Sequence, residues 1–157
     1  MASDLNYVPP QPRRKSETYW SGLSLSVTTA TPLNLVTALK AITPTSGTSL
    51  TNNPFFNLTT DKLAVYNENL SATIKISFVG AFTGGATNRG LINTYTLTQS
   101  DVLVANRPVT NPNDYFTFIE IIAVDQNGFA ATDGVTTTLQ AVGGNYVISS
   151  VKLVIEQ

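Results

Sequence analysis

The chain has 157 residues, of which 42% are hydrophobic and 12% charged, with a formal net charge of −1. It contains no histidine and no cysteine, which excludes disulfides, thiol nucleophiles, histidine-based catalytic triads and the commonest metal ligands. Its 23 threonines and 14 asparagines favour strands and turns. We therefore expect an all-β protein with no cofactor and no metal site.

Residues 1–17 predict an extended N-terminal arm that is distinct from the domain behind it. Prolines enforce an extended, polyproline-like path, and a basic cluster follows them directly. The residues expected to make the arm's contacts are Pro9, Pro10, Pro12, Arg13, Arg14 and Lys15. Three readings stay open for this segment: an anchor on another protein, a disordered tail, or a proline-rich ligand of a peptide-binding domain.

Short segments with the alternation of half-buried strands follow along residues 18–157. The clearest is 71–80, in which Ala72, Ile74, Ile76 and Phe78 share one face. Segment 33–42 also partly fits a helix, and 115–124 is apolar on both faces, as in a central strand. The expected strands are 22–29, 33–42, 55–58, 62–67, 71–80, 91–98, 115–124, 135–142 and 146–156. This spacing predicts an antiparallel β-sandwich or jelly roll of roughly 8–9 strands.

Catalytic chemistry has few candidates in this chain. The carboxylates that could form a glycosidase-type pair are Asp101, Asp114, Glu120, Asp125 and Asp133. Most of them fall in turns, and we read Glu120, which lies mid-strand, as a solvent-facing or subunit-facing residue. The stretch from Asp125 to Gly128 lacks the spacing and the closing glutamate of a calcium loop, so we expect an Asn-Gly hairpin turn there. We therefore expect no enzymatic activity.

Two features would serve a carbohydrate-binding module. The first is a platform of aromatic side chains, for which the candidates are Trp20, Tyr66, Tyr95, Tyr115 and Tyr146. Such residues are more often core or interface anchors, and we favour that reading. The second is a site formed by the loops 83–90 and 106–114, which we keep as the location of a receptor site in the alternative function.

The closing segments resemble those of tumour-necrosis-factor-like jelly rolls, including the tips of bacteriophage fibres. The resemblance lies in the order of "YFTFIEIIAV", a hairpin, "VTTTLQAV", Gly-Gly-Asn and "YVISSVKLVIEQ". It implies that the last strand lies at the centre of a trimer. The predicted subunit interface is one face of that strand: Val147, Val151, Leu153 and Ile155. Ile148 and Val154 keep its other face partly apolar.

The overall composition also resembles that of tailed-phage virion proteins, with much Thr, Asn and Gly and few charges. The resemblance implies a non-enzymatic structural protein of the virion: a head fibre, a capsid decoration or a tail fibre component. It would form a homotrimer and bind a capsid or other virion protein through its arm. The alternative is a module for host attachment that binds a receptor or a surface glycan. No basic stripe suggests nucleic acid, and no apolar stretch is long enough for membrane insertion.

Overall fold

The computed structural model describes residues 12–65, 67, 69–84, 86–96, 99–106, 108, 110 and 112–157, and the side chains of these residues except 99–101. Pro9, Pro10 and Tyr66 therefore lie outside the described residues. No helix of the described part is long and apolar enough to cross a membrane.

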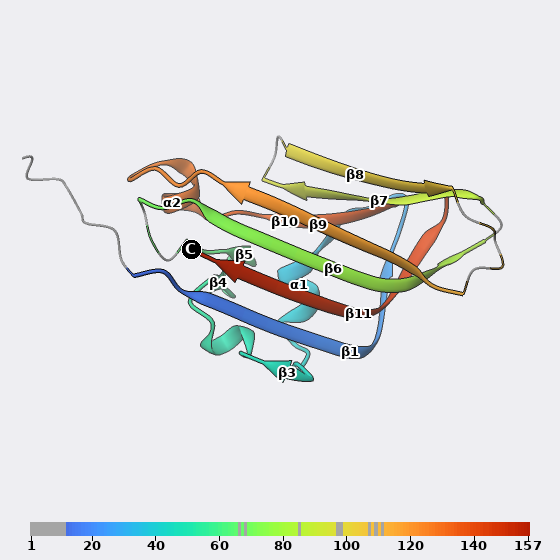
Figure 1. Ribbon diagram of the computed structural model, residues 1–157, viewed down its shortest axis with the longest axis horizontal. Helices are drawn as coiled ribbons and strands as arrows, with labels where there is room; N and C mark the ends of the chain where they lie inside the picture. Colours follow the sequence, from blue (N-terminus) through green and yellow to red (C-terminus); the bar gives the residue numbers. More distant parts are fainter. Residues whose placement is uncertain are drawn as a thin grey trace, which may run out of the picture.

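Two antiparallel sheets form the body of the molecule (Figure 1). The five-stranded sheet has the order β3 (Ser46–Gly47), β1 (Lys15–Val27), β11 (Asn145–Glu156), β6 (Ala72–Thr83) and β9 (Asp114–Ile122). The four-stranded sheet has the order β2 (Leu33–Asn34), β10 (Thr137–Val142), β7 (Asn88–Tyr95) and β8 (Gln99–Asn106). The short pieces are β4 (Phe56–Asn57), β5 (Lys62–Leu63), α1 (Leu35–Leu39), α2 (Phe129–Asp133) and the 3₁₀ helix Leu50–Asn52. This architecture confirms the predicted all-β sandwich of jelly-roll type.

The core lies between the two sheets and follows from alternation along the strands. On β6, Ala72, Ile74, Ile76 and Phe78 are buried, as predicted, while Thr73 and Lys75 are exposed. Trp20 is fully buried, and its indole N–H donates to the Ile42 carbonyl oxygen at 3.1 Å. The single polar group of the Trp20 side chain is therefore hydrogen-bonded although the side chain is buried.

Three segments differ from the expectation. Residues 33–42 form only a two-residue strand and then α1, because the side-chain oxygen of Asn34 caps the helix by accepting from the N–H groups of Val36 and Thr37. Strand β8 was not anticipated. The Asp125–Gly128 stretch is a turn, but it leads into α2 and crosses from β9 to β10 in the other sheet, so it is not a hairpin.

The first strand begins earlier than the predicted boundary after residue 17. Lys15 and Glu17 already pair with β11, opposite Glu156 and Val154. The ladder continues to Arg14, whose N–H donates to the carbonyl oxygen of Gln157 at 2.6 Å and whose carbonyl accepts from the Gln157 N–H at 2.9 Å. The start of β1 and residue 157 therefore lie at the same end of the molecule. The loops after β6, β8 and β10 lie at the opposite end (Figure 1).

Candidate functional site at the loop end

The structure brings together the two loops that were predicted as a receptor site. Arg89, at the end of the first loop, and Asp114, at the end of the second, form an ion pair with 3.1 Å between Nη2 and Oδ2. Their side chains are 2% and 1% exposed. Nη2 also lies 3.4 Å from Oδ1 and donates to the Pro108 carbonyl oxygen at 3.3 Å. A buried charge pair therefore joins the loops that follow β6 and β8.

Aromatic residues surround this pair. The guanidinium of Arg89 lies 5.6 Å from the centroid of the Phe82 ring, within the range of a cation–π contact. Phe82, Phe116 and Tyr146 pack with ring centroids 4.8 to 6.1 Å apart. The Tyr146 hydroxyl donates to the Asp114 carbonyl oxygen at 2.8 Å. Burial, and secondly the negative charge of Asp114, raise the pKa of the Tyr146 phenol far above its ordinary value.

The turn between β10 and β11 closes the same end. Gly143 has a φ of +79°, and a Cβ atom there would lie 2.1 Å from the carbonyl oxygen of Asn88. A Cβ on Gly144 would lie 2.6 Å from the carbonyl oxygen of Thr83. Only glycine permits this approach, so the Gly-Gly turn packs directly against both ends of the loop between β6 and β7.

The aromatic platform is not present in the form the sugar-binding hypothesis needs. Trp20, Tyr95 and Tyr146 are buried in the core, which confirms the core reading for these three. Tyr115 is exposed, on the outer face of β9. A planar sugar-stacking surface requires several exposed rings, and the described candidates supply one.

The candidate carboxylates serve structural roles or lie apart. Asp114 is the buried partner of Arg89, and the Asp125 carbonyl accepts the N–H of Gly128 in a turn. Glu120 is half-buried on the face of β9 that carries Phe116 and Phe118, so it is not fully exposed to solvent, and the subunit-facing position stays a prediction. Asp133 ends α2, and the side chain of Asp101 is not described. Within the described residues, no three or more acidic side chains gather where they could hold a metal ion.

The predicted interface strand has a different role within one chain. Val151, Leu153 and Ile155 are buried in the core of the sandwich, whereas Val147 is half-buried. The cause is an irregularity of the β11–β6 register between Ile148 and Ser150, which shifts the alternation by one residue. Tyr146 and Ile148 therefore face the core before it and Val151 after it, and Val147 faces outward. The core position leaves three of the four residues with no surface for a partner.

Exposed apolar side chains are found instead on β8 and on β9, the last strand of each sheet. We call this set the β8–β9 apolar surface: Val102, Leu103, Val104, Tyr115, Ile119 and Ile121. On β9, Ile119 is 58% and Ile121 66% exposed. Segment 115–124 was read as a central strand because both of its faces are apolar. The predicted central position is wrong: β9 is the edge strand of its sheet, and its apolar outer face is uncovered in the single chain.

Comparison with known proteins identifies the family. Residues 12–157 match the family described as the Sf6-type phage tail needle knob or tip of some Caudovirales. The tail needle protein of Shigella phage Sf6 is 38% identical over 145 residues, which are 92% of this chain and 50% of that protein. The chain thus spans about half the length of the curated relative that it matches.

Two solved structures show a partial similarity to this chain. The PRD1 vertex protein P5 has a TM-score of 0.49 at 12% identity, covering 91% of this chain and 95% of that chain. The Eiger TNF of S. frugiperda has a TM-score of 0.49 at 10% identity, covering 92% of each chain. The family is established by the sequence matches alone: this chain belongs to the Sf6-type tail needle knob family of phage virion proteins.

Proposed function

We propose that this chain is a non-enzymatic structural module at the tip of a phage tail needle. The observation that supports this most strongly is the family match over residues 12–157. The match favours a tail location over the head fibre and capsid decoration that were also expected. The architecture agrees with a tip: β1 begins at one end of the sandwich, and the three loops held by Arg89, Asp114 and the Gly-Gly turn lie at the other (Figure 1).

The module assembles as a homotrimer through the β8–β9 apolar surface. Both strands end their sheets, and in Figure 1 both lie on the side away from β3. An uncovered edge strand with apolar side chains would invite aggregation. Burial of this surface against other copies removes the side chains from water, at about 25 cal/mol for each Å² of apolar surface. Other copies of this chain are the partners we propose, because they are present wherever the chain itself is present.

The test is the mass of the protein in solution. We expect a particle of about 50 kDa by light scattering, three times the 16.8 kDa of one chain. The double substitution Ile119→Asp and Ile121→Asp should produce monomers, because it places charges on the exposed face of β9. Ser46→Asp adds a charge to the exposed strand at the opposite edge of the same sheet and should leave the trimer intact. A wild-type monomer would contradict the proposal.

The N-terminal arm connects the module to the rest of the virion. The contacts where the arm joins the domain support this proposal. Arg14 is hydrogen-bonded to Gln157, and Arg13 lies 3.5 Å from the Glu156 carboxylate. Tension on the arm would therefore act along β1, which pairs with β11 in the middle of the sheet. Arg14 and Lys15 begin the domain's own ladder and Arg13 pairs with Glu156, so we place the anchoring contacts in residues 1–11.

A pull-down from purified virions lacking this protein tests the arm. A chain that starts at Pro12 retains the whole β1 ladder, unlike one cut after residue 17, which would lose three paired residues. We expect this shortened chain to remain a trimer and to lose binding to the virion. Equal binding by the full and shortened chains would refute the role of the arm.

A further inference from the structure

A polar hollow lies at the other end of the molecule, between the β4–β5 hairpin and α2. Its volume is about 260 Å³, close to the lower limit of the ~300–1,000 Å³ typical of small-molecule sites. Five polar side chains line it: Asn57, Thr60, Lys62, Thr132 and Asp133. The hollow shares no residue with the β8–β9 apolar surface and differs from it in chemistry.

The two walls of the hollow are fixed to each other by backbone hydrogen bonds. The N–H of Leu63 donates to the Val135 carbonyl, and the N–H of Val135 donates to the Leu63 carbonyl, both at 2.8 Å. The Lys62 ammonium also donates to the backbone oxygen of Asp133 at 2.9 Å. Gly134 has a φ of +73°, and a Cβ there would lie 2.7 Å from the Leu63 carbonyl oxygen. The spacing of the walls is therefore set before any ligand arrives.

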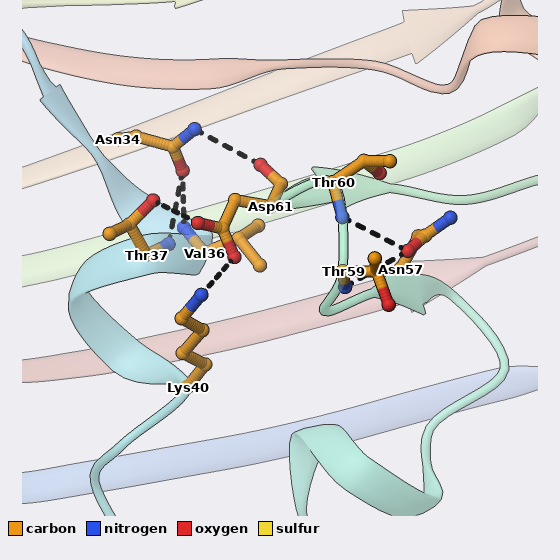
Figure 2. A network of polar contacts seen from close by, with 8 residues as sticks. All are labelled: Asn34, Val36, Thr37, Lys40, Asn57, Thr59, Thr60 and Asp61. Atoms are coloured by element: carbon orange, nitrogen blue, oxygen red, sulfur yellow. Dashed lines mark hydrogen bonds and ion pairs between the residues drawn. The ribbon is translucent and has the colours of Figure 1, made fainter.

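The turn that carries Thr60 is also held in place (Figure 2). The side-chain oxygen of Asn57 accepts from the N–H groups of Thr59 at 3.0 Å and Thr60 at 3.2 Å. On the other side of the turn, the Asp61 carboxylate binds the Thr37 hydroxyl at 2.8 Å and the Lys40 ammonium at 2.7 Å (Figure 2). Lys40 and Thr37 hold the pKa of the Asp61 carboxyl below its usual range.

The Asp61 backbone is tied down as well. Its carbonyl oxygen accepts from the side-chain amide of Asn34 at 3.0 Å, and its φ is +54°. Asn34 is the residue that caps α1, so a single side chain joins the helix to the turn. A residue held in this sparsely populated backbone region requires such surroundings. The polar groups of the hollow are thus preorganised, which lowers the entropy cost of binding.

The chemistry of the lining matches a ligand with several hydroxyl groups. The oxygen of Asn57 is used by the turn, so its NH₂ group is the part that can donate to a ligand. The Lys62 ammonium has three N–H donors, of which one donates to the backbone oxygen of Asp133. The Asp133 carboxylate accepts from the Thr132 hydroxyl at 3.0 Å and has further lone pairs. Hydroxyl groups both donate and accept, so they can satisfy both kinds of group.

The charge and the apolar residues of the lining further restrict the class of ligand. The charges of Lys62 and Asp133 have opposite sign, so the lining has no net charge and favours a neutral ligand. Three small apolar residues complete the wall: Ala64, Val65 and Ala131. These can cover the C–H face of a sugar ring, and the volume suits a single ring. We propose that the hollow between the β4–β5 hairpin and α2 binds a neutral sugar unit of a glycan.

The experiment uses the full chain on an array of neutral and acidic glycans, followed by calorimetry with the neutral glycans that bind. Lys62→Met keeps the aliphatic stem but removes the donors, and Asp133→Ala removes the carboxylate but keeps the backbone oxygen. Each should weaken binding by about tenfold or more, because each removes a hydrogen bond of a charged group. Lys75→Met, on the exposed face of β6, removes the same charge away from the hollow and should change nothing.

Several results would overturn the proposal. The proposal fails if the wild-type chain binds no neutral glycan, or if it binds acidic glycans alone. It also fails if wild type, Lys62→Met and Asp133→Ala bind with equal affinity. The mass of each variant by light scattering reports on folding and assembly. The two proposals can fail separately, because sugar binding tests the hollow and the mass tests the β8–β9 apolar surface.

Discussion

Removal of either partner of the Arg89–Asp114 ion pair should strongly destabilise the loop end of the sandwich. The pair is almost fully buried, and the loss of one partner leaves the other charge without compensation in the core. Such a change costs about 3–5 kcal/mol, a large part of the ~5–15 kcal/mol by which a domain is stable. At roughly 2–4 °C for each kcal/mol in a chain of this length, the melting temperature should fall by roughly 6–20 °C.

The measurement is a double-mutant cycle in thermal and urea unfolding, at one fixed protein concentration because assembly contributes to stability. The variants are Arg89→Met, Asp114→Leu and the double variant that combines Arg89→Met with Asp114→Leu. The double variant should lose less stability than either single variant, since apolar side chains of similar size can replace a buried pair at little cost. The difference gives the coupling energy between the two charges.

The matched control is the ion pair between Lys152 and Glu17, which is shorter at 2.7 Å but whose side chains are about half exposed. Lys152 lowers the pKa of the Glu17 carboxyl, yet solvent screens an exposed pair. Lys152→Met should therefore shift the melting temperature far less than Arg89→Met. Similar shifts for the two variants, or strictly additive losses in the cycle, would refute the reasoning that burial decides the effect.

Two further predictions concern the same end of the molecule. Tyr146→Phe should cost about 0.5–1.5 kcal/mol in urea unfolding, because it removes the buried hydrogen bond from the phenol to the Asp114 carbonyl oxygen. Burial raises the pKa of the Tyr146 phenol in the folded state. Above the ordinary pKa of 10.0 the unfolded chain therefore binds fewer protons than the folded chain, and the free energy of unfolding falls as pH rises. Tyr146→Phe should show a flatter fall with pH, and identical pH profiles for the two proteins would contradict this. Gly143→Ala should destabilise the protein by at least about 1 kcal/mol more than Gly84→Ala. Both glycines have a positive φ, but only at Gly143 would the added Cβ lie 2.1 Å from a backbone oxygen. Equal losses of stability would show that the close contact relaxes.

The sequence alone determined the class of the fold and much of the core. Alternation on β6 placed Ile74, Ile76 and Phe78 inside because a strand points successive side chains to opposite faces, whatever the tertiary context. The absence of histidine and cysteine excluded whole classes of chemistry without any structure. Trp20, Tyr95 and Tyr146 were read as core anchors because large aromatic side chains have much surface to bury, and the structure confirms this reading.

The tertiary structure alone decided which apolar face is covered. A strand that is apolar on both faces has the same sequence pattern at the centre of a sheet and at an edge that meets a partner, so Ile119 and Ile121 could not be placed from the pattern. The register irregularity in β11 turned Val151 inward, and one residue of shift exchanges the two faces of a strand. Arg89 and Asp114 pair across 25 positions, and the polar hollow joins segments about 70 residues apart. Such contacts depend on how the strands are ordered in the two sheets, which local periodicity does not encode.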